Sequence, residues 1–288
     1  MILRDARQIL LVSRPVSWIN TAFPFAAAYF LNTGDLDPIL VVGVLYFLIP
    51  YNMAMYGIND VFDYTSDLAN PRKGGIEGAL LQPRLHGPTL WAAVVTNLPL
   101  LALLVLWGSP ASAAALAVSV FAVVAYSAPK LRFKERPFLD SMTSSTHFVS
   151  PAAVGLAMAG ANMTIDVVLI LVAFFLWGMA AHAFGAVQDV TPDRDAGIGS
   201  IATVLGARST VRCSLALWAL AGLAMLFVSS PGPLAALLVI PYLANAAPWA
   251  GVSDDEAAQV NAAWRRFIFL NYGAGFLATM IFILAWNM

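Results

Sequence analysis

Long runs of apolar residues without a single charge follow one another along most of the chain. A helix needs about 20 predominantly apolar residues to cross the hydrocarbon core of a bilayer. Two of the runs are about twice that length, and turn residues interrupt each of them, at 108–110 and at 229–233. The pattern therefore predicts about nine transmembrane helices. The runs cover residues 15–34, 38–59, 85–129, 141–165, 167–188, 213–253 and 267–288.

The order of these runs repeats itself. Two single spans and a hairpin are followed by two single spans and a hairpin, and then by one last helix. We therefore expect one domain built from two four-helix repeats, about 1–130 and 131–253, with a final helix at about 264–288. Because four is an even number, the two repeats share one orientation in the membrane, as parallel repeats do.

The basic residues support this topology. With nine spans, all 15 lysines and arginines fall on one side of the membrane, and the other side holds only three charged residues, Asp35, Asp37 and Asp166. Loops that are rich in lysine and arginine stay in the cytoplasm. We therefore expect a multi-pass protein of the cell membrane, with its N-terminus and its basic loops in the cytoplasm.

The composition excludes several classes of protein. Of the 288 residues, 60% are hydrophobic and 11% are charged, whereas soluble domains carry about 25% charged residues. The net charge of −1 offers no basic surface to nucleic acid. A single cysteine excludes an intrachain disulfide and a thiolate metal site, and three widely spaced histidines do not suggest a histidine-rich one. The chain is thus expected to be an integral membrane protein surrounded by membrane lipid.

Charge is concentrated in one short segment, NDVFDYTSDLANPRK, at 59–73. Asp60, Asp63 and Asp67 are spaced i, i+3 and i+7, which places them on one narrow face of a helix. Three carboxylates so close together repel one another and require a positive partner. Mg²⁺ fits this requirement, because proteins bind it through one or two carboxylates together with the phosphate oxygens of a substrate.

A second acidic segment, DVTPDRDAG, occupies 189–197. Like the first, it follows the second span of its repeat. Asp189 and Asp193 are four residues apart, and Pro192 is expected to end or bend the helix, so Asp195 is a weaker candidate ligand. Two acidic clusters at equivalent repeat positions favour a metal site over a solvated helix end, because carboxylates in membrane helices seldom lack a role.

A basic segment follows the fourth span and begins with YSAPK, from Tyr126 to Lys130. Lysine and arginine can stabilise the charge that develops on a diphosphate as its ester bond breaks. Arg72 and Lys73 make the same case after the first acidic segment. The alternative is a tyrosine of the interfacial belt followed by ordinary cytoplasmic charge. Spacing alone does not decide between these two interpretations.

A few polar side chains lie inside the predicted spans. His182 precedes Asp189 by seven residues, so it could point into the same space. Asn20 and Asn52 could line a cavity between the helices. Each of these side chains could equally hydrogen-bond to a neighbouring helix, as polar side chains do in membrane bundles.

Together these motifs resemble those of the UbiA-type intramembrane prenyltransferases. NDVFDYTSD at 59–67 matches the NDxxDxxxD signature of that superfamily, DVTPDRDAG at 189–197 matches DxxxDxxxG, and YSAPK at 126–130 matches YxxxK. The segments SRPVSWINTAFPFAAAYF (13–30) and NPRKGGIEGALL (70–81) resemble the lycopene elongase branch, whereas members that prenylate aromatic rings carry an Arg-Pro-rich segment after the first motif. The resemblance implies a helical bundle around a central cavity, with both aspartate motifs at its cytoplasmic mouth.

The resemblance also implies the chemistry and the residues that perform it. A prenyl group passes from dimethylallyl diphosphate to lycopene or a related acyclic carotenoid, towards fifty-carbon products, and the resulting tertiary cation loses a proton or captures water. Mg²⁺ would be held by Asp60, Asp63, Asp67, Asp189 and Asp193, with Asp195 as a weaker ligand, and the diphosphate would be bound by Asn59, Arg72, Lys73, Tyr126, Lys130 and Arg194. The acceptor cavity would include Asn20, Asn52, Tyr56 and His182. The aromatic rings that could stabilise the cations are those of Tyr56, Phe62, Tyr126 and Phe184.

Two other functions stay open at this point. A UbiA-type enzyme could instead prenylate an aromatic or quinone-precursor acceptor. A membrane transporter would share the parallel-repeat architecture, but transporters place their polar residues near the middle of the bilayer at broken helices. In this chain the carboxylates gather at one end of the predicted spans.

Overall fold

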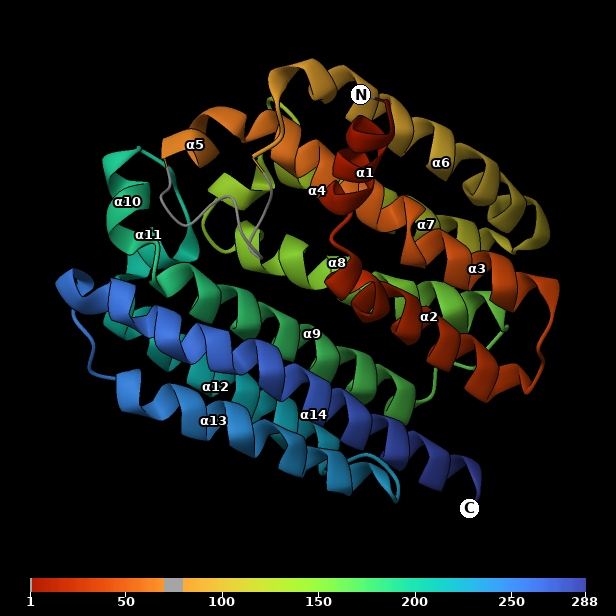
Figure 1. The fold of residues 1–288 in the computed structure, drawn as a ribbon. Helices are drawn as coiled ribbons and strands as arrows, with labels where there is room; N and C mark the ends of the chain where they lie inside the picture. The colour runs from red at the N-terminus through yellow and green to blue at the C-terminus, as the bar shows by residue number, and fades with distance from the viewer. Residues whose placement is uncertain (1, 70–79) are drawn as a thin grey trace. The chain divides into compact units, whose positions relative to one another are not determined.

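The computed structural model describes residues 2–69 and 80–288. Within this part of the chain every regular element is a helix, which confirms the prediction of an all-α protein (Figure 1). Six of the described helical segments are long and apolar enough to cross a membrane. They are Pro38–Phe62, Pro83–Trp107, Pro110–Ser127, Ile165–Val187, Gly232–Trp249 and Asp254–Trp286.

The chain divides into two compact units. The first contains Met1–Phe133 and His147–Ala161, and the second contains Lys134–Thr146 and Asn162–Met288. Helix α8 (Leu139–Met158) therefore contributes its first part to the second unit and its remainder to the first. The main segment of the first unit ends at Phe133, close to the boundary between repeats that the sequence predicts at about residue 130. The internal repeat itself stays a prediction.

The first unit consists of helices that follow one another closely along the chain. Among them, α4 packs against α6 and α7, and α2 packs against α3. The helices are α1 (Ile2–Val12), α2 (Trp18–Thr33), α3 (Pro38–Leu48), α4 (Pro50–Phe62), α5 (Tyr64–Ala69), α6 (His86–Trp107) and α7 (Pro110–Ser127), with short 3₁₀ helices η1 at Pro15–Ser17 and η2 at Pro83–Leu85.

Prolines and capping side chains set the helix boundaries in this unit. The predicted span 38–59 is two consecutive helices, because Pro50 has no backbone N–H with which to continue α3. Asp37 caps α3 by accepting hydrogen bonds from the backbone N–H of Leu40 and from the hydroxyl of Tyr29. Burial raises the pKa of the Asp37 carboxyl, but the hydrogen bond from Tyr29 and the backbone N–H groups at the start of α3 together outweigh burial and hold its pKa below the ordinary value.

The predicted turn at 108–110 separates α6 from α7. The side chain of Ser109 accepts a hydrogen bond from the backbone N–H of Ser112, and the side chain of Ser112 accepts one from the backbone N–H of Ser109. This reciprocal cap satisfies two N–H groups that have no partner within the helix. Pro110 then starts α7 at a position where its fixed φ suits the helix.

Aromatic side chains form the core of the first unit. Phe25, Tyr46, Phe47 and Tyr51 are almost fully buried between α2, α3 and α4. The rings of Phe47 and Tyr51 meet edge to face, with their centroids 5.2 Å apart, a geometry that their quadrupoles favour. Packing of this kind holds membrane helices together, because lipid chains are as apolar as the side chains and provide no hydrophobic drive.

The second unit is built on long helices that run side by side (Figure 1). In it, α12 packs along α9, and both η4 and α13 pack against α12 and α14. The elements are α9 (Ile165–Val187), α10 (Val190–Asp195), α11 (Ile201–Leu205), α12 (Ala207–Met225), α13 (Ile240–Ala246) and α14 (Asn261–Trp286), with 3₁₀ helices η4 (Gly232–Val239), η5 (Ala247–Trp249) and η6 (Asp254–Val260).

The core of the second unit is also aromatic. Phe184, Trp218, Tyr242 and Phe267 are almost fully buried in one cluster. The rings of Trp218 and Tyr242 stack with their centroids 5.6 Å apart, and Phe184 meets Trp218 edge to face. Phe184, which the sequence offered as a cation-stabilising ring, therefore has a packing role in this unit.

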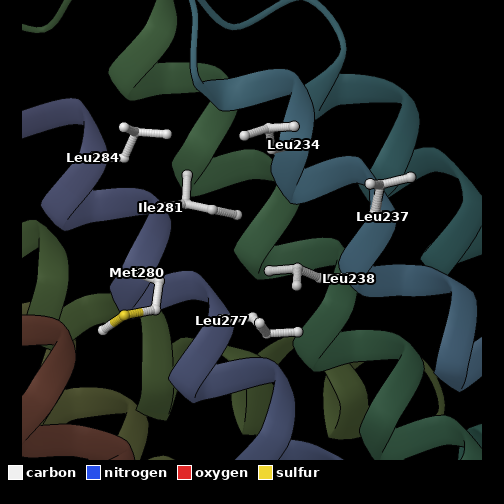
Figure 2. A pocket seen from close by; sticks show the side chains of 7 residues that line it. All are labelled: Leu234, Leu237, Leu238, Leu277, Met280, Ile281 and Leu284. Carbon is white, nitrogen blue, oxygen red and sulfur yellow. The ribbon is translucent and has the colours of Figure 1, made fainter.

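An open groove of about 290 Å³ lies between η4 and α14 of the second unit. Figure 2 shows the leucines of η4 on one side of it and the aliphatic side chains of α14 on the other. Both elements belong to candidate spans, and lipid chains are as apolar as leucine. This surface therefore suits contact with membrane lipid. The lining residues are Leu234, Leu237, Leu238, Leu277, Met280, Ile281 and Leu284.

Glycine permits a close helix contact in the first unit. Gly155 of α8 lies so near α2 that an added Cβ would sit 2.6 Å from the carbonyl oxygen of Phe25 and 3.1 Å from the Cβ of Ala28. A backbone carbonyl cannot swing aside as a flexible side chain can. Small residues at helix contacts in membranes serve this purpose, because they let backbones approach.

Gly155→Ala is therefore expected to destabilise the protein. Alanine gains about 1 kcal/mol of helix propensity over glycine, but overpacking a close contact costs about 1–3 kcal/mol, and a clash with backbone belongs at the upper end of that range. Thermal unfolding of the purified protein in detergent should show a lower Tm. Gly275→Ala on α14 is the matched control, because nothing lies within 4 Å of its added Cβ. Equal Tm values for the two variants would contradict the close contact.

Candidate functional site

The first acidic motif lies where α4 ends. Asp60 is in the last turn of α4 and Asp63 caps it, and their exposed fractions are only 2% and 5%. The expectation that Asp60, Asp63 and Asp67 share one face of a continuous helix is wrong, because α5 begins at Tyr64. Aspartate is a poor helix former, since its short side chain competes with the backbone for hydrogen bonds. The side chain of Asp67 is not among those that the structure describes.

A buried ion pair holds Asp60. The Nη2 atom of Arg14 lies 3.0 Å from Oδ1 of Asp60, whose side chain has no exposed surface. The same guanidinium lies 4.2 Å over the ring centroid of Tyr56, in a cation–π contact. An unpaired carboxylate buried to this degree would cost several kcal/mol, so Arg14 makes a charged Asp60 tolerable. Tyr56, expected in the acceptor cavity, supports Arg14 here.

Arg132 has the matching place beside Asp63. Its Nη2 atom lies 3.5 Å from Oδ1 of Asp63. The chain reaches this position through a turn after α7, in which Ala128 is extended and Lys130 and Arg132 have φ values of 72° and 40°. Residues other than glycine seldom adopt such angles, and the ion pair helps to offset their cost. Lys130 itself is exposed.

The YSAPK segment touches the first acidic motif through Ser127. The hydroxyl of Ser127 donates a hydrogen bond of 2.9 Å to Oδ1 of Asn59, which fastens the end of α7 to the end of α4. Tyr126 packs edge-on against the ring of His147, with the centroids 5.1 Å apart. The first unit thus brings together two motifs that lie far apart in the sequence.

The second acidic motif lies where α9 ends. Asp189 follows the last residue of α9, Val187, by two positions and precedes the short helix α10. The helix ends before Pro192 and not at it, and Pro192 sits in the first turn of α10, where its missing N–H costs little. The backbone N–H of Asp193 donates to the carbonyl of Asp189 at 2.9 Å. Both aspartates are half-buried, whereas Asp195 is exposed.

Arg194, expected to bind the diphosphate, has several contacts within the second unit. Its guanidinium forms an ion pair with Asp254 and donates to the carbonyl of Thr203 at 2.8 and 3.0 Å. Asp254 also accepts a hydrogen bond of 2.7 Å from the backbone N–H of Ala207. These contacts join α10 to η6 and to the start of α12. A role for Arg194 in diphosphate binding stays a prediction.

Asp140 is a buried carboxylate that the sequence interpretation missed. Its side chain has no exposed surface, and its Oδ2 atom accepts a hydrogen bond of 2.7 Å from the backbone N–H of Ile201. Its Oδ1 atom accepts one of 2.8 Å from the backbone N–H of Ser141. The Nε2 atom of His182 lies 3.6 Å from Oδ2. Asp140 therefore joins the starts of α8 and α11 to α9.

The predicted cavity residues Asn20 and Asn52 have different surroundings. Asn52 is completely buried, and its amide group donates to the hydroxyl of Thr21 at 2.7 Å and to the carbonyl of Phe47 at 2.9 Å. Of the two alternatives for this residue, the structure favours the cross-helix hydrogen bond. Asn20 lies on the exposed side of α2. The predicted diphosphate ligands at positions 72 and 73 lie outside the described residues.

Sequence reasoning did not assign a site role to Arg14 or Asp140, and it included Arg132 only among the basic residues that follow YSAPK and could stabilise a diphosphate. Arg14 and Asp140 are each the last charged residue before a charge-free run, on the same predicted side of the membrane as the aspartate motifs. A charged residue at the end of a predicted span could have been taken as a candidate site residue. Arg132 gives no comparable signal, because it is one of four basic residues within seven positions.

The donor atoms available suit Mg²⁺. No three histidine, cysteine, aspartate or glutamate side chains converge on one point among those that the structure describes. Each unit nevertheless presents a pair of carboxylates from its motif, Asp60 with Asp63 and Asp189 with Asp193. Proteins commonly bind Mg²⁺ through one or two carboxylates and leave the other positions to substrate phosphates and water. The residues present therefore fit the ion.

Relatives of the chain are found among carotenoid enzymes. A model of the UbiA prenyltransferase family matches residues 21–273. The lycopene elongase/hydratase of Corynebacterium glutamicum is 50% identical over 96% of this chain and 96% of its own length. The C(50) beta-cyclic carotenoids biosynthesis protein LbtBC of Dietzia sp. is 55% identical over 96% of this chain, which spans only 65% of that longer protein.

Solved structures share the fold. The structure of a UbiA homolog from Archaeoglobus fulgidus bound to GPP and Mg²⁺ aligns with a TM-score of 0.68 over 92% of this chain and 98% of that chain, at 20% identity. The same homolog bound to DMAPP and Mg²⁺ aligns equally well. The family model covers most of the sequence, and relatives identical at half of their positions span nearly all of it. The chain therefore belongs to the UbiA prenyltransferase family.

Proposed function

We propose that this protein is a Mg²⁺-dependent prenyltransferase that acts on carotenoids. It transfers a dimethylallyl group from dimethylallyl diphosphate to lycopene or a related acyclic carotenoid, on the way to fifty-carbon products. The observation that carries the proposal is its identity of 50% and 55%, over 96% of the chain, to relatives whose names specify lycopene elongation and C50 carotenoid synthesis. A homolog of the same fold that binds DMAPP and Mg²⁺ supports the choice of donor and metal.

The two aspartate motifs supply the metal ligands in this proposal. When bound, Mg²⁺ neutralises the negative charge that develops on the diphosphate as its ester bond breaks. Within the first unit, Arg14 and Arg132 hold the carboxylates of Asp60 and Asp63 and offset the cost of burying them. The proposed ligands are Asp60, Asp63, Asp67, Asp189 and Asp193, with Asp195 as a weaker candidate because its side chain is exposed.

Polar and basic side chains near the motifs are proposed to bind the diphosphate. Lysine and arginine beside the leaving group stabilise its charge in the transition state. The contact of Asn59 with Ser127 supports a place for the YSAPK segment in the same site. The proposed residues are Asn59, Arg72, Lys73, Tyr126, Lys130 and Arg194.

A hydrocarbon acceptor agrees with the composition of the spans. The seven charge-free runs contain no lysine or arginine that could pair with a carboxylate inside the membrane. A phenolic acid would need such a partner, because an unpaired buried charge is costly. An acyclic carotenoid has no polar group to satisfy and already resides in the bilayer.

Water is proposed to end the reaction. The terminal alkene of the carotenoid donates its π electrons to the allylic carbon, the diphosphate leaves with the electron pair of the C–O bond, and a tertiary cation is left on the carotenoid. The relative from Corynebacterium glutamicum is named an elongase and a hydratase, which supports addition of water to this cation. Loss of a proton to form an alkene is the competing outcome.

We further propose that α2, α8 and α12 also cross the membrane, which gives nine spans in two four-helix repeats and a last helix. These helices have 16, 20 and 19 residues and coincide with apolar runs of the sequence. The positive-inside rule then places both aspartate motifs at the cytoplasmic face of the cell membrane.

Reporter fusions test this topology. Fusions after Gly34 and after Met288 should both read as external, because an odd number of spans separates each position from the cytoplasmic N-terminus. A fusion after Arg136 should read as cytoplasmic. A cytoplasmic signal at either of the first two positions would contradict the nine-span topology.

Loss of a single aspartate from either motif is expected to abolish most turnover. Asp60→Asn and Asp189→Asn keep the side-chain volume and remove a charge, so each should lower kcat by about 100-fold or more. The double variant should be little worse than the worse single one, because residues that act as one unit are not additive. Prenyl transfer in membranes, normalised to folded protein, gives the measurement.

The control for these variants is Asp35→Asn, an exposed residue of the loop between α2 and α3, which should keep normal turnover. Folding is checked by the Tm of each purified variant. Near-normal activity of both motif variants would contradict a role in metal binding and leave these aspartates with a structural role only, such as the ion pair of Asp60 with Arg14.

The acceptor is tested with membranes that contain this protein. Supplied with lycopene, dimethylallyl diphosphate and Mg²⁺, they should form products that are heavier by one or two five-carbon units, as measured by mass spectrometry. Prenylation of 4-hydroxybenzoate or of a naphthoate, with lycopene left unchanged, would overturn the carotenoid assignment and leave only the family assignment.

A further inference from the structure

We propose that the outer face of helix α1 (Ile2–Val12) binds anionic phospholipids at the cytoplasmic surface of the membrane. The partner is a lipid whose head group carries a negative charge, and the contact is separate from the metal and diphosphate chemistry. The proposal rests on one part of the proposed function, the topology that places the N-terminus in the cytoplasm.

Helix α1 is too short to cross the membrane. It has 11 residues and is therefore about 16 Å long, roughly half the thickness of the hydrocarbon core. Its sequence, ILRDARQILLV, combines charged and apolar residues. A short helix of this composition is suited to the interface between lipid and water, where its apolar side chains contact acyl chains and its basic side chains contact head groups.

One face of α1 is held by the first unit. Both carboxylate oxygens of Asp5 accept hydrogen bonds of 2.7 Å from the guanidinium of Arg84, just before α6. Val12, seven residues further on the same face, is fully buried and packs with Leu81 and Leu85. Helix α1 also contacts α4 and α6. These contacts fix the rotation of α1 about its axis and so determine which of its side chains face outward.

The opposite face of α1 is both basic and apolar. Arg4 and Arg7 are exposed, and neither has an ion-pair partner among the residues that the structure describes. Leu10 and Leu11 are 44% and 47% exposed. Positions 4, 7 and 11 are spaced by three and four residues, so they lie on one side of the helix. Asp5, the single carboxylate of α1, is on the side that faces the protein and does not neutralise this surface.

Helix α1 lies beside helix ends that the proposed topology places at the cytoplasmic surface. Val61, near the end of α4, packs against the cluster that contains Val12. The chain then continues into α2, where the exposed apolar side chains begin with Val16 and Ile19, at 61% and 52% exposure. The leucines of α1 are therefore next to a surface that suits lipid, and its arginines are on the side where anionic head groups attract positive charge.

A phospholipid satisfies both features of this face. Its phosphate accepts hydrogen bonds from guanidinium groups, whose planar geometry suits phosphate oxygens. Its acyl chains remove the two leucines from water, while the long arginine side chains reach outward to the head groups. A soluble anion such as free diphosphate would pair with the arginines but leave the leucines exposed. The combination therefore favours an anionic lipid over a soluble anion.

Fluorescence quenching in bilayers measures which lipid lies next to α1. The full-length protein is reconstituted in phosphatidylcholine and carries one fluorophore at Ala6→Cys, an exposed position of α1, with Cys213→Ser to remove the native thiol. Brominated phosphatidylglycerol should quench the fluorophore more strongly than brominated phosphatidylcholine at the same mole fraction. High salt should remove the difference, because it screens exposed charges.

Arg4→Gln and Arg7→Gln should each lower the preference for phosphatidylglycerol by about fivefold. The double variant should show little or no preference. The matched control is the pair Arg265→Gln and Arg266→Gln at the start of α14, which are exposed and lie on the same predicted side of the membrane. This control should keep the wild-type preference, and equal Tm values would show that all variants are folded.

Two results would overturn the proposal: equal quenching by the two brominated lipids in the wild type, or an unchanged preference in the double variant. An equal loss of preference in the α14 control would also overturn it, because the preference would then reflect net charge alone. If the double variant instead lost binding of an unreactive thiolo analogue of dimethylallyl diphosphate in pure phosphatidylcholine, the arginines would belong to the diphosphate site, and the lipid role would be wrong.

These outcomes are separate from those of the proposed function. The quenching experiment contains neither a prenyl donor nor a carotenoid, so a protein that forms no prenylated product could still show the lipid preference. Conversely, prenyl transfer to lycopene without any lipid preference would refute the role of α1 and leave the proposed function standing. The reporter fusions described above test the topology independently of both.

Discussion

The burial of charge in an apolar protein is the constraint on which the rest of this structure depends. Asp60 is completely buried at the end of α4, and Arg14 from the segment before α2 reaches it over the ring of Tyr56. A carboxylate removed from water to this degree persists as an ion only if a cation and further hydrogen bonds replace its hydration. In the first unit, α4 ends at the acidic motif, and Arg14 and Arg132 each place a guanidinium beside one of its carboxylates. Each arginine that approaches the motif adopts a backbone conformation that residues other than glycine seldom adopt.

In the second unit, too, hydrogen bonds and ion pairs compensate the carboxylates, but the partners are different. Asp140 receives two backbone N–H groups and faces an imidazole, and Asp254 pairs with Arg194 and caps the start of α12. In both cases a single carboxylate joins three segments of chain. Short helices such as α10 and α11 could not persist alone in water, so these contacts are what fix the chain around the second aspartate motif.

The sequence predicts many of the helices and turns well, but it predicts poorly which side chains from distant segments come into contact. The turn at 108–110 follows from Gly, Ser and Pro, which break or cap helices for local reasons. The helix break at Asp63 and the contact of Arg14 with Asp60, 46 residues apart, depend on how the chain folds back on itself. Hydrophobic periodicity carries no information of that kind. The motifs indicated the family because they are long and specific, whereas single residues such as Asp140 have no motif to mark them.

The central requirement of the proposed function is that the buried aspartates bind the donor through a metal ion. Binding of an unreactive thiolo analogue of dimethylallyl diphosphate to the purified protein, measured by calorimetry, tests this most directly because it does not depend on the acceptor. We predict binding in the presence of Mg²⁺, its loss in EDTA, and its loss in Asp60→Asn but not in Asp35→Asn. Equal binding with and without Mg²⁺, or undiminished binding by Asp60→Asn, would contradict it.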